Sequence, residues 1–391
     1  MSLKNEIRDE LVQHIIPFWQ NQQDDKEGGY YSYLSFDLEQ DKAAVKGCIL
    51  NSRILWFFSN AYLLLQNEEL LNNAKHAYNF FLNHYLDTLH GGVYWSVEAD
   101  GKPYDTIKHT YNQAFMIYAL SSYYDASKDK QALAHAFDLF YIIEDKCKDD
   151  IGYLEAFTKE FVPHSNEKLS ENGVLATRTM NTLLHILEAY SELFRVSNNE
   201  EVKDKIKYIL LSFKSQIYNR KESRLDVFFD LKYKSLINLK SYGHDIEAAW
   251  LIDRAAELIG DRKVIDVMHM VTNNLEESVY KMGYRNGSLL NECEDGVDNT
   301  LRIWWVQAEG MVGFMNAWQK HHDKKYYDVV KNIWTYIKTY IIDHRKGSEW
   351  LWEVDEEGIA SSRKPIIELW KCPYHNGRMC IEMIRRLTDE E

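Results

Sequence analysis

The chain has 391 residues, of which 45% are hydrophobic, and its formal net charge is −14. This length and hydrophobic content are sufficient for one large or two ordinary folded domains. The negative charge argues against a nucleic-acid partner and against an anionic membrane surface, since both favour a basic face, and no apolar run approaches the roughly 20 residues of a membrane-spanning helix. The first residues lack the pattern of a signal peptide and the five cysteines contain no CxxC pair, so we predict a cytoplasmic protein with reduced thiols.

An amphipathic helix is predicted first, over residues 4–20, and a repeating unit of one ribbon and two helices follows it. The ribbons alternate apolar and polar residues for a few positions and then reach Asp, Asn, Gly or Lys, which is typical of a short β-ribbon with a turn. Six such segments recur roughly every 60 to 70 residues, as in a repeat protein. In chain order they lie at 28–39, 91–103, 152–163, 224–235, 287–298 and 348–360.

Two helices follow each of the first five ribbons, because apolar residues there recur with a helical period. The predicted ranges are 49–66 and 68–86, 108–126 and 130–147, 173–196 and 201–218, 244–259 and 262–280, 302–321 and 324–342. After the sixth ribbon a single helix is predicted over 374–387, so the first and last helices complete a sixth pair. A closed ring allows a repeat to be split between the termini in this way. We therefore predict an all-α (α/α)6 barrel, a single domain over residues 1–391 with the ribbons on one face, with an irregular α-solenoid as the alternative.

The helix after each ribbon carries unusual residues near its start. They include Asn51, Arg53, His109, Tyr111, Asn181, His185, His244, Glu247, Trp305, Glu309, His375 and Arg378. Polar groups inside an apolar helix stripe are costly unless they are paired or used. Because these residues fall at the same place in every repeat, a ring would bring them to one central cleft.

Spacing within these helices supports a shared site. Asn181 and His185 are four residues apart and face the same way, while His244 and Glu247 are three residues apart. A carboxylate one turn from a histidine can orient the ring and raise its basicity. His375 and Arg378 share the same three-residue spacing.

Structural explanations of these residues stay open. A single helical histidine is more often a core residue than a catalytic one, and Trp304, Trp305 and Trp370 suit a helical core as well as a sugar site. Arg53 is equally well explained as a buried ion-pair partner of Glu247 or Glu309. Three further histidines at helix ends away from the cleft are expected to be solvated: His321, His322 and His344.

The residue types in this cleft suit proton transfer at a carbon beside a carbonyl, which a reducing sugar offers once its ring opens. One neutral histidine would remove the C2 proton, Arg53 would stabilise the enediolate, and a second histidine would return a proton on the opposite face. A single base that moves the proton from C2 to C1 would give aldose–ketose isomerisation instead. No set of residues has convincing metal-site spacing, and there is no phosphate-binding loop, dinucleotide fingerprint or serine nucleophile elbow, so we predict neither metal ligands nor a cofactor.

Seven stretches carry a family resemblance: GCILNSRILWFFS (47–59), LSENGV (169–174), TMNTLLHILEAY (179–190), SYGHDIEAAWL (241–251), IWWVQAE (303–309), SEWLW (348–352) and WKCPYHNGRMC (370–380). They span nearly the whole chain and resemble the N-acylglucosamine 2-epimerase superfamily, and within it the cellobiose 2-epimerases. The resemblance implies an (α/α)6 barrel without a cofactor. It also implies reversible C2 epimerisation of the reducing-end glucose of β-1,4-linked disaccharides, from cellobiose to glucosyl-mannose and from lactose to epilactose.

The resemblance also implies roles for individual residues. His244 and His375, in the GHD and HNGR motifs, match the two acid/base residues, and His185 would assist ring opening or hold the enediolate. Asn181 matches a position that assists ring opening. Residues that match substrate contacts, or that we place among them, are Arg53, Tyr111, Glu247, Trp305, Glu309, Trp370 and Arg378.

Other functions remain alternatives. An isomerase of the same fold would act on mannose or a related sugar, and an N-acylglucosamine 2-epimerase would act on an acylated monosaccharide; an open groove flanked by Trp305 and Trp370 would favour a disaccharide. A glycoside hydrolase would need two carboxylates about 5 to 9.5 Å apart, for which the candidates are Glu247, Glu309 and Glu368. A non-catalytic carbohydrate-binding protein is the last alternative. We expect a small-molecule disaccharide as the partner and a monomeric protein.

Overall fold

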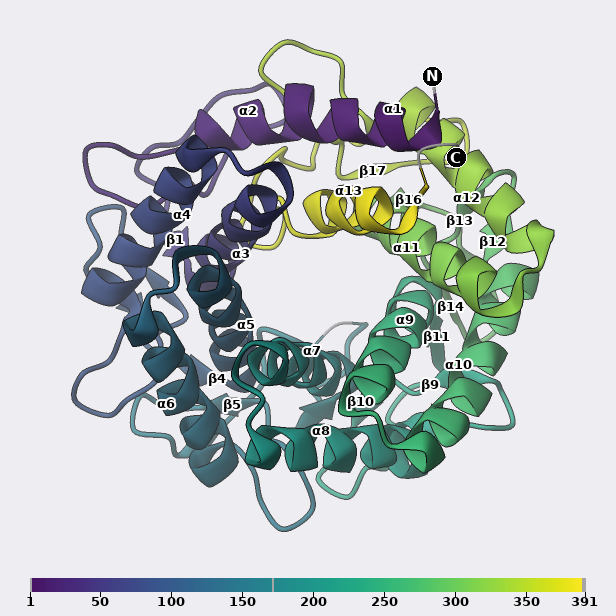
Figure 1. Cartoon of the computed structure of the whole chain (residues 1–391), viewed down its shortest axis with the longest axis horizontal. Coiled ribbons are helices and arrows are strands. Elements are labelled where there is room, and N and C mark those ends of the chain that lie inside the picture. Colours follow the sequence, from purple (N-terminus) through teal and green to yellow (C-terminus); the bar gives the residue numbers. More distant parts are fainter. Residues whose placement is uncertain (1, 171, 389–391) are drawn as a thin grey trace.

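The computed structural model describes residues 2–170 and 172–388, and its helices form a closed ring of six pairs (Figure 1). The inner helices are α3 (Cys48–Leu65), α5 (Thr110–Ser127), α7 (Met180–Ser197), α9 (Tyr242–Ile259), α11 (Trp304–His321) and α13 (His375–Arg386). The outer helices are α1 (Leu3–Asp9) continued by η1 (Glu10–Ile15) and α2 (Ile16–Gln20), α4 (Glu68–Phe80) with η2 (Phe81–Tyr85), α6 (Lys130–Lys146), α8 (Glu200–Ser212) with η3 (Phe213–Ile217), α10 (Arg262–Met282), and α12 (Lys324–Tyr336) with η4 (Ile337–Ile341). The η segments are π-helical turns. The predicted (α/α)6 barrel is confirmed, with both termini at one seam of the ring.

The same tight turn joins the inner to the outer helix in five pairs. The inner helix ends at a residue with left-handed backbone, and the next residue caps the outer helix by accepting the backbone N–H two positions later. The left-handed residues are Gln66, Lys128, Asn198, Gly260 and His322. The capping residues are Asn67, Asp129, Asn199, Asp261 and Asp323. This turn sets each outer helix antiparallel to its inner partner.

The ribbons link neighbouring repeats rather than closing on themselves. The strand before an inner helix pairs with a strand of the next ribbon along the chain, in antiparallel register. These pairs are β1 (Lys46–Gly47) with β2 (Ser96–Val97), β4 (Lys108–His109) with β5 (Ala156–Phe157), β7 (Arg178–Thr179) with β10 (Phe228–Phe229), β11 (Leu239–Ser241) with β14 (Glu292–Glu294), and β16 (Arg302–Ile303) with β17 (Glu353–Val354). Outer strands β3 (Pro103–Asp105), β6 (Pro163–His164) and β15 (Val297–Asn299) extend three of these sheets. Two small hairpins complete the set, β8 (Tyr218–Asn219) with β9 (Arg224–Leu225) and β12 (Tyr284–Arg285) with β13 (Ser288–Leu289).

A buried side chain at the fourth position of an inner helix ties the helix start to its own ribbon. Gln307 accepts the backbone N–H of Leu289 over 2.8 Å and donates to its carbonyl over 2.8 Å. At the equivalent positions, side-chain oxygens of Asn51, Gln113 and Asp245 accept the backbone N–H groups of Tyr30, Val93 and Leu225, respectively. The inner helix starts are therefore fixed relative to the ribbon face.

Three expectations need correction. The predicted ribbon at 28–39 forms no strand: Leu34 makes isolated bridges to Gln40 and, across the seam, to Ile367. The helix predicted from residue 173 begins at Met180, because Gly173 has a positive φ of 71° and Thr179 caps the helix by accepting the N–H of Thr182. Glu171, within the LSENGV stretch, lies outside the described residues, as do the ends of the predicted domain at residues 1 and 389–391.

The third correction concerns α3, whose 18 residues have a mean hydropathy of 1.3 and so meet the length and composition of a membrane-spanning helix. From the sequence alone, no apolar run of this length is expected. In the structure, 78% of this helix is buried inside the ring, and its first turns carry Asn51, Ser52 and Arg53. We interpret α3 as a core helix of the barrel.

Candidate active site

A cavity of about 380 Å³ opens among the starts of the inner helices. Residues from all six inner helices line it: Arg53, Tyr111, Asn181, His185, His244, Glu247, Trp304, Trp305 and His375, with Trp370 from the segment before α13. Every predicted site residue lines this cavity except Glu309 and Arg378, which lie behind its wall. The expected convergence of the helix starts on one cleft is therefore what the structure shows.

Sequence reasoning missed the part of the cavity that the ribbons and their flanking segments supply. These lining residues are Leu169, Val227, Phe228, Leu239, Ser241, Asn291, Glu292, Asn299, Leu301, Ile303, Trp352, Glu353 and Lys364. Several lie in the alternating segments at 224–235, 287–298 and 348–360. The alternation could have indicated which of them face inward, but only the pairing between ribbons shows that they reach the cavity.

His375, the first residue of α13, is oriented by a carboxylate from a neighbouring helix. Its Nδ1 lies 2.7 Å from Oε1 of Glu309 on α11, which leaves Nε2 as the nitrogen available to a substrate. Burial, reinforced by Arg53 and Arg378, lowers the pKa of His375 well below its ordinary value. At neutral pH the imidazole is a base in its uncharged form.

His244 is held by a hydroxyl and not by the carboxylate that its spacing suggested. Its Nδ1 lies 2.8 Å from Oγ of Ser241, whereas Glu247 bonds to Arg378. The prediction that Glu247 orients His244 is wrong, because Glu247 forms an ion pair with Arg378 of α13 instead. Burial lowers the pKa of His244 to about 3, so this ring is also uncharged at neutral pH.

His185 does have a carboxylate one turn away, in Glu188. Its Nδ1 lies 3.0 Å from Oε2 of Glu188, and the hydroxyl of Tyr374 donates to the same oxygen over 2.5 Å. Burial lowers the pKa of His185 although Glu188 opposes the shift. Burial works against ionisation of Glu188 as well, but Arg378 and His185 outweigh it and hold the pKa of this carboxyl below its ordinary range.

Arg53 makes none of the ion pairs that were considered for it. Its guanidinium donates to the hydroxyl of Tyr111 over 2.9 Å and to the carbonyl of Trp370 over 3.2 Å. It is stacked between the rings of Phe115 and Tyr374, at 4.2 and 4.5 Å from their centroids. Among the residues that the structure describes, no carboxylate pairs directly with this positive charge on the cavity wall, and none provides a hydrogen-bond partner for Nε of Arg53. Such a group can stabilise negative charge that develops on a bound molecule.

Arg378 was expected to contact substrate, but it is 0% exposed and acts inside the wall. Its guanidinium bonds to Glu188, Glu247 and Glu309. Glu309 likewise faces this cluster and not the cavity. Burial and the nearby Glu309 raise the pKa of Glu247 to about 8, so the cluster around Arg378 carries less negative charge at neutral pH than its three carboxyl groups suggest.

Glu247, Glu309 and His375 bring one ligand atom each within 4.8 Å of one another, and a metal ion could be held by such a set. The sequence did not suggest this group, because its members come from three different helices. The guanidinium of Arg378 donates to both carboxylates. Arg378 therefore already supplies the positive charge beside Glu247 and Glu309.

Trp305 lies between the two histidines that the sequence singled out. Its ring centroid is 4.8 Å from that of His244 and 5.4 Å from that of His375. Trp370 packs edge-on against Tyr111 at 5.8 Å. Both tryptophans are half-buried and line the cavity, so they present ring surface to an occupant, whereas Trp304 is largely buried.

A second cleft of about 400 Å³ continues from the first and shares Trp352, Lys364 and Trp370 with it. Glu368 lines this second cleft, where its side chain accepts the backbone N–H of Trp370 over 2.9 Å. Trp370 lines this second cleft but Trp305 does not, so the groove flanked by both tryptophans that was expected to favour a disaccharide is found only in part.

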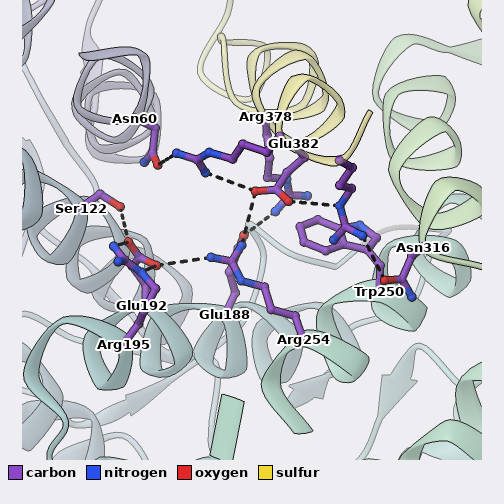
Figure 2. Close-up of polar contacts among 12 residues, drawn as sticks. Asn60, Ser122, Glu188, Glu192, Arg195, Trp250, Arg254, Asn316, Arg378 and Glu382 are labelled. Atoms are coloured by element: carbon purple, nitrogen blue, oxygen red, sulfur yellow. Dashed lines mark hydrogen bonds and ion pairs between the residues drawn. The ribbon is translucent and has the colours of Figure 1, made fainter. Parts of the chain in front are cut away.

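A further polar cluster lies along the inner helices, on the side away from the ribbons (Figure 2). Arg254 is 3.5 Å from Glu192 and 3.7 Å from Glu382. Each inner helix contributes at least one member, namely Asn60, Ser122, Glu192, Arg254, Asn316 and Glu382. This belt of paired charges connects the inner helices beyond the end of the barrel at which the cavity lies.

The histidines expected to be solvated differ from one another. His322 and His344 are exposed. His321 is exposed as well, as expected, and its Nε2 is also 2.9 Å from the buried carboxylate of Glu276.

Comparisons with known proteins agree with the motifs and the geometry. A family model described as N-acylglucosamine 2-epimerase matches residues 28–375. The chain is 49% identical over 385 residues to a cellobiose 2-epimerase of Ruminococcus albus, which covers 98% of this chain and 99% of that protein.

Two solved structures are also similar over almost their full length. A sugar epimerase from a ruminal bacterium has a TM-score of 0.98 at 48% identity, covering 99% of this chain and 100% of the other. The cellobiose 2-epimerase of Bacillus thermoamylovorans B4167 has a TM-score of 0.95 at 43% identity, covering 98% and 99%. The chain therefore belongs to the N-acylglucosamine 2-epimerase family.

Proposed function

We propose that this protein is an epimerase that reversibly inverts C2 of the reducing-end glucose of β-1,4-linked disaccharides, converting cellobiose to glucosyl-mannose and lactose to epilactose. One observation carries the proposal: the uncharged imidazoles of His244 and His375 flank Trp305 in a single cavity, each held through Nδ1 so that Nε2 is available. Two bases in one cavity are what inversion at a carbon through proton transfer needs. We expect the protein to act as a cytoplasmic monomer without a cofactor.

The reaction begins with ring opening, which exposes an aldehyde at C1. We assign assistance in this step to Asn181 and His185; Oδ1 of Asn181 is an acceptor in the cavity wall that has no partner among the described residues. One of His244 and His375 then takes the C2 proton on its Nε2. The electrons of the C2–H bond form the C1–C2 double bond and the charge moves to O1, giving an enediolate.

Arg53 and Tyr111 are assigned to the enediolate, since the guanidinium is the charged donor on the cavity wall. A preorganised positive charge of this kind favours the transition state in which the oxyanion forms. The other histidine takes a proton from water on its Nε2 and delivers it to C2 from the opposite face, the first histidine releases the C2 proton to water, and ring closure completes the epimer. Trp305 and Trp370 are assigned to stacking on the two sugar rings.

The geometry disfavours hydrolysis. Glu247 and Glu309 approach within 4.8 Å and share the guanidinium of Arg378, and Glu309 does not reach the cavity. Glu368 lies in the second cleft. A hydrolase needs two carboxyl groups about 5 to 9.5 Å apart on either side of the scissile bond, and this set does not provide them.

The proposal predicts which sugars react. Separate incubations with cellobiose, lactose, mannose and N-acetylglucosamine, followed by chromatography of the products, should show a new disaccharide from cellobiose and from lactose. The single variants His244→Ala and His375→Ala should each lower kcat by about 100- to 10,000-fold. Glucose released from cellobiose would indicate a hydrolase, and fructose formed from mannose without reaction of cellobiose would indicate an isomerase. No reaction with any sugar would favour a binding protein.

A further inference from the structure

Trp250 is a buried residue of α9 to which the proposed mechanism assigns no part. Its indole N–H donates to Oε2 of Glu309 over 3.1 Å. The other oxygen, Oε1, accepts from Nδ1 of His375 over 2.7 Å and from Arg378 over 2.6 Å. Trp250 is 0% exposed and does not line the cavity in the described part of the chain, so any effect on the reaction has to pass through its neighbours, of which Glu309 accepts its hydrogen bond.

The ring of Trp250 is enclosed by two guanidinium groups. The Cζ atom of Arg378 lies 4.9 Å from the ring centroid, and that of Arg386 lies 5.8 Å from it. Arg386 is in turn bonded to Asn316 over 3.2 Å. Figure 2 shows Trp250 close to Asn316, which is a member of the belt of paired charges. Packing and cation–π attraction hold the indole plane, and with it the direction of the N–H.

We propose that Trp250 is a positioning residue for His375: its N–H keeps the carboxylate of Glu309 in place as the acceptor for the Nδ1–H of His375, so that Nε2 of this ring is directed at the substrate. The inference rests on the proposed epimerisation. Outer hydrogen bonds that orient a reacting imidazole are a general device of active sites.

The electrostatic surroundings of Glu309 explain why the indole N–H of Trp250 matters for the charge of this carboxylate. The charged and titratable groups that face it are Arg378 and His375 from α13, Glu247 and His244 from α9, and Glu188 from α7. Burial raises the pKa of Glu309, while Arg378 and Trp250 oppose that shift. Without the indole N–H, Glu309 takes up a proton at higher pH. A protonated carboxyl group is a weaker acceptor for His375 than a carboxylate.

Two substitutions separate the hydrogen bond from the packing. Trp250→Phe keeps an aromatic ring and removes the N–H, whereas Trp250→His superposes its Nε2 on the indole nitrogen and removes only the benzene ring. We expect Trp250→Phe to lower kcat by about 10- to 100-fold, to leave KM within about twofold of the native value, and to move the acid limb of the pH profile to higher pH. Trp250→His should retain a higher kcat than Trp250→Phe and the native acid limb.

The control is Trp350→Phe, because Trp350 is also 0% exposed and donates to a carboxylate, Oε1 of Glu10, over 2.8 Å at the seam of the ring. Trp350→Phe should keep the native kcat and pH profile.

An equal loss of kcat in the two Phe variants, or a lower kcat in Trp250→His than in Trp250→Phe, would overturn the inference and show that the packing of the ring matters instead. If Trp250→Phe does not fold by circular dichroism, a shifted acid limb in folded Trp250→His overturns it. An inactive native protein would refute the proposed function instead, whereas an active native protein with an unaffected Trp250→Phe would refute only the role of Trp250.

Discussion

Three histidines line the cavity, and a different partner holds Nδ1 of each. Ser241, Glu309 and Glu188 are these partners for His244, His375 and His185. A fixed Nδ1 determines which nitrogen is available to the substrate, and burial keeps each ring uncharged. The imidazoles are therefore prepared to accept a proton before any substrate enters.

The pH dependence of the reaction follows from these shifts. Burial lowers the pKa of His244 from 6.5 to about 3 and that of His375 well below 6.5. A histidine with a lowered pKa stays a base until the pH falls through the lowered value, so the acid limb of kcat/KM should have its midpoint clearly below pH 6.5. Initial rates with cellobiose between about pH 4 and about pH 9 test this expectation, because kcat/KM should not be half-maximal near pH 6.5 and should fall, if at all, only at the acid end of the range. A midpoint at or above the ordinary imidazole value would contradict the buried, uncharged state of the two bases.

The site residues at the inner helix starts were predictable from the sequence, but the lining residues from the ribbons and several hydrogen-bond partners were not. Repeat position alone places Asn181 and His185 correctly on the cavity wall. The pairs His375–Glu309 and Arg378–Glu247 join different inner helices, and spacing along one helix contains no information on which helix lies opposite. This is why Arg378 was expected at the substrate and is found within the wall.

At the scale of elements, the ribbon face is fixed by hydrogen bonds between the inner helix starts and the ribbons. Gln307 is 0% exposed and pairs with both backbone groups of Leu289. Apart from the start of α7, the helix ranges were predictable to within a few residues because periodicity and capping residues are local signals. The pairing of β1 with β2 was not, since it joins two repeats that are distant in sequence.

Replacing Gln307 should show how much its hydrogen bonds to Leu289 contribute to the free energy of unfolding. In Gln307→Leu the N–H and C=O of Leu289 lose their partner in a buried place, and each unsatisfied group costs about 1 to 3 kcal/mol. We therefore expect the free energy of unfolding to fall by about 2 to 6 kcal/mol. Urea denaturation provides the measurement. Gln131→Leu, at an exposed position of α6, is the matched control and should change stability by less than about 0.5 kcal/mol. A similar loss in both variants would show that the link contributes little.

At the scale of the whole molecule, the ring is closed by the N-terminal helix against the sixth repeat. His14 of η1 lies at this seam: its Nδ1 is 2.8 Å from Oε1 of Glu10 and its Nε2 is 3.1 Å from the carbonyl of Ser348. Both partners are acceptors, so both ring nitrogens carry a proton. Burial opposes the charge, but Glu10, Glu349 and the carbonyl of Ser348 outweigh it and raise the pKa of His14 to about 9.

This raised pKa makes closure of the ring dependent on pH. The stabilisation by His14 is fully present below pH 6.5 and is lost as the pH rises through about 9. The native protein should have a higher Tm than His14→Gln at pH 6, and the difference should shrink toward pH 10. For a chain of this length about 1 kcal/mol moves the Tm by about 1 °C, so the comparison requires scanning calorimetry of both proteins in matched buffers. A difference that stays constant or grows with pH would contradict the account of the seam.

The (α/α)6 ring places residues of six helices and their ribbons around one cavity, and the central claim is that this cavity exchanges and inverts the proton at C2 of a reducing disaccharide. Proton NMR of the protein with cellobiose in deuterated water tests it most directly. The account predicts mannose-type reducing-end signals from a product that carries deuterium at C2. A mannose-type product without deuterium at C2 would contradict proton transfer through solvent-exchanged histidines, and an unchanged spectrum would contradict the proposed epimerisation itself.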